Sequence, residues 1–216
     1  MLHHRWSSVA KSDSAVTVLP DGCRDILIVS KPGQPTIVRL TNWDTQPQNV
    51  EITAGTKFTG FRLKPGSSVA HHELAQITED HLQVTELIES AVTPDEDIAA
   101  VISALAEPFS TVREVSKSAG VTIRTLQRQF KALALPQPEF WRLLGRARKA
   151  ALALPNSTPL VEIAHTFGYS DQAHMTRDFV RWFGLPPTRL RCDQALLEQI
   201  SQPALGNWTG EQISIR

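Results

Sequence analysis

The chain has 216 residues, which is enough for one large domain or for two small ones that each bury a core. Hydrophobic residues make up 41% and charged residues 20%, as in ordinary globular proteins, and no apolar run reaches the length of about eighteen residues that indicates a transmembrane helix. The formal net charge is zero, yet residues 1–110 hold 8 Lys/Arg against 14 Asp/Glu, whereas residues 111–191 hold 13 against 5, so positive charge is concentrated in the second half.

This basic segment favours a polyanion as its partner, although the same charges could equally solvate helix surfaces. The N-terminal residues lack the apolar core of a signal peptide. The two cysteines, Cys23 and Cys192, are too few and too far apart for a disulfide framework or a zinc quartet. We therefore expect a cytoplasmic protein without a metal, another cofactor or a membrane partner.

Residues 16–70 have the pattern of short strands separated by turns. The stretch AVTVLPDGCRDILIV places apolar runs on either side of a Pro-Asp-Gly turn. KPGQPTIVRL and FTGFRLKPGSSV repeat the combination of apolar segments and Pro-Gly turns. The pattern predicts a small, mostly antiparallel sheet or partial barrel.

Helical periodicity follows these strands. ITEDHLQVTELIESAV spaces its leucines and isoleucines as one face of a helix does. In VTPDEDIAAVISALAEP, Thr93 is placed to cap a helix, and Pro108 lies just beyond its end. The predicted organisation is a β-rich sensor or dimerisation domain at 1–90, an all-helical domain at 91–191 and a C-terminal tail at 192–216 that could pack on either domain or fray.

The helical part contains an approximate internal repeat. VREVSKSAGVTIRTLQRQF (112–130) matches LVEIAHTFGYSDQAHMTRDF (160–179), with one extra residue in the second copy. Each copy has a short apolar helix, a turn that contains glycine and a second helix, which is the helix-turn-helix pattern. This outline alone is weak evidence for function, because helical hairpins are common packing units.

The second helix of each copy has an apolar face and a cationic face. The apolar faces are predicted to consist of Leu126, Phe130 and Leu133 in the first copy and of Met175, Phe179, Trp182 and Phe183 in the second. Any single exposed arginine is usually only solvated. However, Arg128 and Arg177 hold the same place in the two repeats, as do Gln127 and Thr176, and all four can bind bases or phosphates.

These residues resemble the DNA-binding domain of AraC/XylS-type transcription regulators, in which a long helix joins two helix-turn-helix units. IAHTFGYSDQAHMTRDFVRWFGLPPTRLR matches the family signature at nearly every position, VSKSAGVTIRTLQRQFK fits the first unit, and Arg146 and Ala150 take expected places in the linker helix. The resemblance spans residues 94–191. It implies a sequence-specific, DNA-binding transcription regulator, either an activator or a repressor, and no enzymatic activity.

The resemblance also implies which residues meet DNA, with both recognition helices in successive major grooves. The implied base-reading positions are Ile123, Arg124, Gln127, Arg128, Gln172, Ala173, His174, Thr176 and Arg177. Candidate phosphate contacts are Lys131, Arg181, Arg189 and Arg191. The implied partners are promoter or operator DNA and, as further candidates, RNA polymerase, a small-molecule effector and a second copy of the chain.

Two regions are less typical of the family. The segment after the first recognition helix, LPQPEFW, has Leu135 in place of a glycine, which predicts a different helix end there and leaves the relative setting of the two units open. The N-terminal half resembles the short β-domain of one subgroup, so the fold class we expect is α+β, with a partial, cupin-like small barrel before the helices. Within it, Asp25 and Arg62 could pair with each other or face a ligand.

Three other functions are compatible with parts of the sequence. A small cupin-type metal enzyme would need clustered ligands, but the adjacent His71 and His72 point in opposite directions in a strand, and Glu73 and His81 have no evident partners. A non-specific or architectural DNA-binding protein would use the positive charge alone. A pure interaction module would not need both repeat-equivalent arginines.

Overall fold

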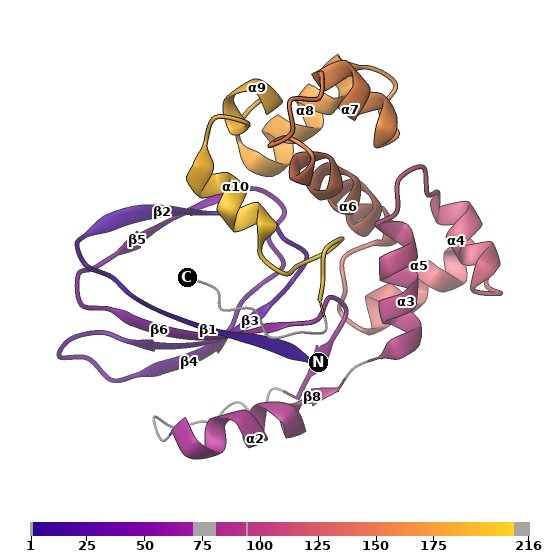
Figure 1. Cartoon of the computed structure of the whole chain (residues 1–216). Coiled ribbons are helices and arrows are strands. Elements are labelled where there is room, and N and C mark those ends of the chain that lie inside the picture. Colours follow the sequence, from indigo (N-terminus) through magenta and orange to yellow (C-terminus); the bar gives the residue numbers. More distant parts are fainter. Residues whose placement is uncertain (1, 71–80, 94, 210–216) are drawn as a thin grey trace.

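The computed structural model describes residues 2–70, 81–93 and 95–209, in which a β-rich part is followed by a group of helices (Figure 1). The strands are β1 (His3–Val9), β2 (Ser14–Val18), β3 (Asp25–Ser30), β4 (Ile37–Leu40), β5 (Gln48–Ile52), β6 (Lys57–Leu63), β7 (Ser68–Val69) and β8 (Val92–Thr93). The helices are α2 (His81–Ala91), α3 (Glu96–Leu105), α4 (Val112–Ser118), α5 (Ile123–Ala132), α6 (Pro138–Leu152), α7 (Leu160–Thr166), α8 (Gln172–Phe183), α9 (Pro187–Leu190) and α10 (Gln194–Ser201).

The main sheet has the strand order β1-β6-β3-β4, and all its pairs are antiparallel. Its central strands bury one face against α2, where Ile26, Ile28 and Phe61 pack with Val84 and Ile88. Antiparallel sheets commonly cover one face with core and leave the other to solvent or to another layer. Burial of the apolar side chains on the covered face is the main source of stability for a small sheet.

The predicted barrel-like closure is not confirmed. In the described residues, β2 pairs with β5 and β7 pairs with β8 as separate two-stranded sheets, and no sheet closes. A barrel requires every strand to bond two neighbours, whereas β2 and β5 bond only each other. Helix α10 lies beside this ribbon instead, and the Gln199 side chain donates to the carbonyl oxygen of Thr17 at 3.2 Å.

The junction between the two parts differs in detail from the prediction. Thr93 belongs to β8, which pairs with β7, so the N-terminal part continues slightly beyond residue 90. The cap of α3 is Asp95, whose side chain accepts from the backbone nitrogen of Ile98 at 3.0 Å. Asp95 rather than Thr93 caps because the β7–β8 ladder holds Thr93 in the sheet.

The C-terminal tail packs on both parts of the molecule. Leu205 is 2% exposed, and its backbone nitrogen donates to the carbonyl oxygen of Asp21 at 3.0 Å. On its other side, the Arg148 guanidinium of α6 donates to the carbonyl oxygens of Leu205 at 3.0 Å and Ile200 at 2.8 Å. Further along, the ring of Trp208 meets that of His4 edge to face, with centroids 4.5 Å apart.

Helices α3 to α10 share one core around α6, which Figure 1 shows running between the pair α4–α5 and the pair α7–α8. Trp141, Leu144 and Ala147 of α6 are fully buried in that core. The core extends to the β-rich part, because Trp43 packs edge to face on Trp141 with a centroid distance of 5.1 Å. No helix among the described residues is long and apolar enough to cross a membrane.

Candidate nucleic-acid interface

The first helical pair, α4 and α5, starts both of its helices with threonine caps. Thr111 accepts from the backbone nitrogen of Glu114, and Thr122 accepts from that of Thr125, each at 3.1 Å. Gly120 lies between the helices with a φ of 69°, a left-handed conformation that favours glycine. These local signals explain why the chain stops and restarts a helix within a few residues, as a helix-turn-helix requires.

Helix α5 presents its polar side chains to solvent. Leu126 and Phe130 are buried in the core. The predicted base-reading residues of this helix and the candidate phosphate contact that follows them are all exposed: Ile123, Arg124, Gln127, Arg128 and Lys131. Leu133 does not join the apolar face, since it lies beyond the end of α5 and is 38% exposed.

The second pair, α7 and α8, repeats this construction. Gly168 forms the turn with a φ of 76°, and Asp171 caps α8 by accepting from the backbone nitrogen of His174 at 2.6 Å. This cap holds the pKa of the Asp171 carboxyl below its ordinary value. The apolar face is buried as predicted, and it consists of Met175, Phe179, Trp182 and Phe183.

The outer face of α8 carries a shallow, widely open hollow. It is lined by Gln172, Ala173, Thr176 and Arg177. Thr176 is half-buried, and its hydroxyl donates to the carbonyl oxygen of Gln172 at 2.9 Å. The structure therefore brings four of the five predicted base-reading residues of this helix to one open face.

His174, the fifth, points inward. Its ring is half-buried, with Nδ1 3.2 Å from the hydroxyl of Ser170 and Nε2 3.3 Å from the guanidinium of Arg146. Arg146 also donates to the carboxylate of Asp178 at 2.5 Å and stacks over the ring of Tyr169 at 4.1 Å. His174 thus belongs to a set of contacts that ties α8 to the linker helix α6.

The four candidate phosphate contacts differ in their surroundings. Lys131, Arg181 and Arg189 are exposed, and Arg181 lies over the ring of Trp182 at 4.6 Å. Arg191 is engaged within the protein, because its guanidinium donates to the carbonyl oxygens of Leu154 at 3.0 Å and Thr158 at 2.7 Å. Its donors stabilise the end of α6 and the loop that follows, so we leave Arg191 out of the proposed interface.

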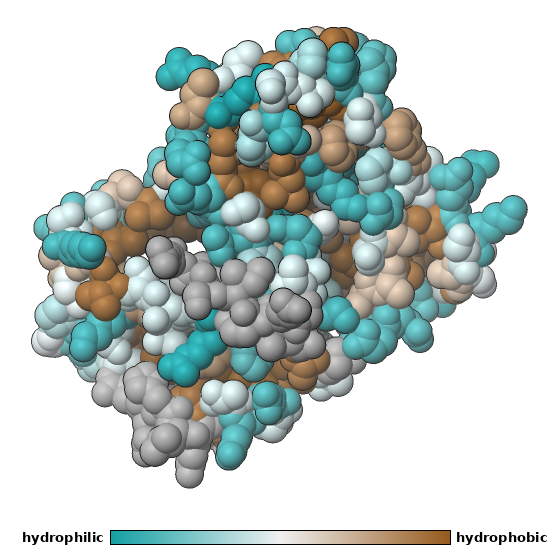
Figure 2. All heavy atoms as spheres, viewed as in Figure 1, coloured by the Kyte–Doolittle hydropathy of each residue, from teal (hydrophilic) through white to brown (hydrophobic). Residues whose placement is uncertain are grey.

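Hydrophilic side chains cover much of the outer surface of both helical pairs in the view of Figure 2, while hydrophobic residues gather between the upper pair and the β-rich part. This distribution follows from the burial of the apolar faces of α5 and α8. Each pair therefore presents a polar helix surface with an arginine at the equivalent place, Arg128 or Arg177.

Comparison with known proteins identifies this part of the chain. A family model described as a helix-turn-helix domain matches residues 115–192. Residues 115–192 form a helix-turn-helix domain of the AraC/XylS type. Such domains are the DNA-binding part of transcription regulators.

Solved structures give two further comparisons for the AraC/XylS-type domain and the whole chain. ToxT from Vibrio cholerae is 8% identical, with a TM-score of 0.50 over 89% of this chain and 98% of ToxT, and so shares its fold. A transcriptional regulator with an AraC-type DNA-binding domain from Chromobacterium violaceum is 26% identical over 50% of this chain and 92% of its own, with a TM-score of 0.39. No curated protein matches the sequence significantly.

Outside the AraC/XylS-type domain, the Asp-rich turn after β2 forms an ion-pair cluster. Arg62 lies 3.1 Å from Asp21 and 3.5 Å from Asp25, and the Trp6 indole donates to Asp25 at 3.0 Å. Asp25 and Arg62 are cross-strand partners, so pairing rather than ligand binding accounts for them. Burial raises the pKa of the adjacent Cys23 thiol, which keeps it protonated.

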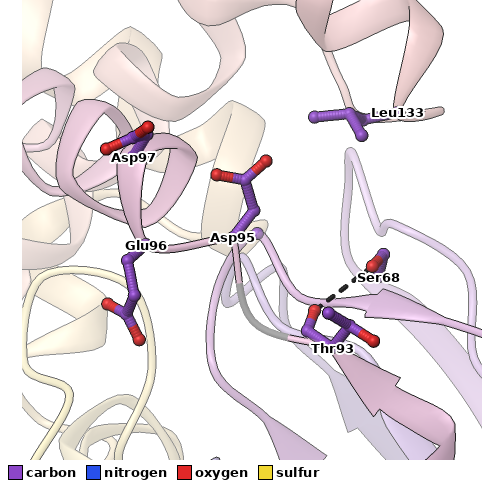
Figure 3. A pocket seen from close by; sticks show the side chains of 7 residues that line it. Ser68, Thr93, Asp95, Glu96, Asp97 and Leu133 are labelled. Atoms are coloured by element: carbon purple, nitrogen blue, oxygen red, sulfur yellow. Dashed lines mark hydrogen bonds between the residues drawn. The ribbon is translucent and has the colours of Figure 1, made fainter.

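A second hollow, of about 380 Å³, lies between β7, β8, the start of α3 and the end of α5 (Figure 3). Its carboxylates come from Asp95, Glu96 and Asp97, whose side chains point in different directions. Asp95 caps α3, and Glu96 lies 3.1 Å from Lys64. Among the described residues, no three His, Cys, Asp or Glu side chains could hold a metal ion together. His71, His72 and Glu73, and the side chain of His81, lie outside what the structure describes.

The role of Arg148 is not evident from the sequence. This side chain is fully buried, and its donors bind backbone carbonyl oxygens of the tail. No local pattern distinguishes it from the solvated basic residues of α6, because its partners lie more than fifty residues further along the chain.

Proposed function

We propose that the protein is a sequence-specific transcription regulator that reads two successive major-groove segments of DNA, one with α5 and one with α8. Recognition helices of helix-turn-helix units contact base edges from their N-terminal residues. The proposed base contacts are Ile123, Arg124, Gln127 and Arg128 from α5, and Gln172, Ala173, Thr176 and Arg177 from α8. Lys131, Arg181 and Arg189 are the proposed phosphate contacts.

The observation that carries the proposal is the repetition of one polar surface on two helices. Arg128 and Arg177 are exposed at equivalent places, each on the side opposite a buried apolar face. An arginine can bind O6 and N7 of guanine with two hydrogen bonds, which distinguishes guanine from the other bases. The two helices otherwise carry different side chains, so they would read different bases.

Selection of bound DNA from a random pool tests the proposal directly. We expect an enriched site with two half-sites about one helical turn, roughly 34 Å, apart. Recovery of no enriched motif would contradict sequence-specific binding. Under the competing hypothesis of a non-specific DNA-binding protein, binding weakens alike for all sequences as salt concentration rises, because counterion release supplies the affinity.

Arg177→Ala tests the assignment of one residue. If Arg177 contacts a guanine, the variant should lose about 1–3 kcal/mol of binding free energy and lose the preference at that base. Arg181→Ala is the matched control. Loss of an exposed phosphate contact should weaken binding to all sequences alike and lower the slope of log affinity against log salt concentration by about 1. An Arg177→Ala variant with a uniform loss across sequences would assign Arg177 to a phosphate instead.

We also propose that the β-rich part regulates the DNA-binding part. Its loop 41–47 contacts both α6, through Trp43 on Trp141, and the end of α8, where Pro47 Cγ lies 3.6 Å from the place of a β-carbon on Gly184. A small-molecule effector, RNA polymerase and a second copy of the chain remain predicted partners. Titration of candidate effectors against the DNA affinity of the full chain would test the first of these.

A further inference from the structure

The turn between α3 and α4 contacts the turn of the second helix-turn-helix unit. A β-carbon placed on Gly168 would lie 3.2 Å from Cδ1 and 3.3 Å from the backbone nitrogen of Phe109. Gly168 lies between α7 and α8, whereas Phe109 lies two residues before Thr111, the cap of α4. The two DNA-reading units therefore meet at a point where one of them has a glycine and little room for a β-carbon.

Phe109 has a backbone conformation that its residue type disfavours. Its φ is 64°, in the left-handed region, which costs a non-glycine residue about 1–2 kcal/mol. Its side chain is 69% exposed, so burial of the ring returns little of that cost. The neighbouring Ser110 stabilises the turn by donating from its hydroxyl to the carbonyl oxygen of Leu105 at 2.6 Å. Neither the local preference of phenylalanine nor core packing explains the left-handed backbone of Phe109. This backbone conformation brings Phe109 into contact with Gly168.

This contact connects the beginnings of two elements that must be placed accurately. Phe109 is joined through Thr111 to α4 and hence to α5, and Gly168 precedes Asp171, the cap of α8. A separate connection runs through the linker helix, where Arg146 of α6 binds Asp178 of α8. Two connections at different points restrict both the separation and the relative rotation of the units, as one connection would not.

We propose that Phe109 is a positioning residue that, held against Gly168, sets the spacing of the two recognition helices and hence the number of base pairs between the half-sites. The inference rests on the proposed function, because a spacing exists only if both helices read DNA. One added base pair moves a half-site by roughly 3.4 Å and turns it by roughly 34° about the helix axis. A rigid pair of units should therefore reject a site that is one base pair too long or too short.

The test compares wild type with Phe109→Gly on sites whose two selected half-sites are separated by the native spacer or by one base pair more or less. Glycine accepts the left-handed backbone without strain and removes the ring, so the variant should be at least as stable as wild type in urea. We expect wild type to prefer its own spacing by about tenfold and the variant by less than about threefold, with base preferences in each half-site unchanged. Phe109→Asn, which also tolerates this backbone, serves as a second variant.

Ile37→Ala is the matched control, because it shortens another exposed apolar side chain, on β4, and should leave the spacing preference unchanged. Unchanged spacing preference in both Phe109 variants would overturn the inference, as would equal weakening at every spacing together with lower stability, which marks a merely structural role. A wild-type selection with only one half-site would overturn the inference and the assignment of both helices to DNA, and would leave sequence-specific binding by one helix standing, whereas unchanged spacing preference in the Phe109 variants overturns the inference alone. A selection with no motif would overturn the proposed function and the inference with it.

Discussion

Some basic residues of the helical part are bound within the protein and others are exposed, a difference that the net charge does not show. Arg146 binds the Asp178 carboxylate, Arg148 is buried against backbone carbonyl oxygens, and Arg191 binds carbonyl oxygens of the loop after α6. These guanidinium groups hold the structure together. The positive charge available to DNA is therefore smaller than the composition of residues 111–191 suggests, and it is concentrated on exposed side chains such as Arg128 and Arg177.

Asp44 should make the free energy of unfolding depend on pH. Burial, with the nearby charges of Asp21 and Asp25, raises the pKa of Asp44 from its ordinary 3.8 to about 6. The folded protein therefore holds this proton more tightly than the unfolded chain does, and stability should fall as pH rises from about 4 to about 6. Asp44→Asn removes this effect. In urea unfolding, the free energy of unfolding of the variant should therefore rise relative to that of wild type as the pH rises over that range. An equal difference between the two proteins at pH 4 and pH 7 would contradict the assignment.

Helix α5 ends with a left-handed backbone conformation on a residue other than glycine. The family pattern has a glycine after the first recognition helix, and the sequence predicts a different helix end here because Leu135 replaces it. In the structure the left-handed residue is Ala134, with a φ of 53°, rather than Leu135, whose backbone nitrogen donates to the carbonyl oxygen of Phe130 at 2.9 Å. The left-handed position therefore lies one residue before Leu135 and on an alanine, for which this conformation is unfavourable.

Ala134→Gly should consequently stabilise the protein. Removing the β-carbon relieves about 1–2 kcal/mol of strain, and the added freedom of the unfolded chain offsets about 0.4–1 kcal/mol of it. We expect the free energy of unfolding to rise by about 1 kcal/mol in chemical denaturation. Ala132→Gly, in the last turn of α5, is the control and should instead lower it by about 1 kcal/mol. Destabilisation by Ala134→Gly would contradict the strain argument.

For the whole molecule, the C-terminal tail holds the two parts together. Leu205 packs on Gly22 of the β-rich part so closely that a β-carbon there would lie 2.7 Å from Leu205 Cβ, while its carbonyl oxygen accepts from Arg148 of α6. The sequence left open whether the tail packs on either domain or frays, and its described residues pack on both parts. Its position makes the two parts thermodynamically dependent on each other.

Leu205→Ala tests that dependence. Loss of a buried leucine side chain should lower the free energy of unfolding by about 2–5 kcal/mol, and calorimetry should resolve separate transitions for the β-rich part and the helices in place of one. Leu133→Ala is the control, because the exposed leucine should cost only about 0.5 kcal/mol and leave a single transition. A single transition in Leu205→Ala would show that other contacts, such as Trp43 on Trp141, suffice.

Much of the helical part could be predicted because its signals are local. The capping residues Thr122 and Asp171, the turn glycines and the proline at the start of α9 each act within a few residues, and the buried stripe of α8 follows from helical periodicity. Leu133 was misassigned because periodicity does not show where a helix stops. His174 fits the reading face by spacing alone, yet Arg146, twenty-eight residues away, draws it inward.

The sequence by itself determined the repeated helix-turn-helix units, their caps and the polar face on which Arg128 and Arg177 lie, because hydrophobic periodicity and turn chemistry act over one or two helical turns. Only the tertiary structure decided that the sheet stays open, that the tail joins both parts and that Phe109 meets Gly168. Each of these depends on contacts between segments far apart in the chain, and their pairing is selected by packing of the whole core rather than by any local pattern.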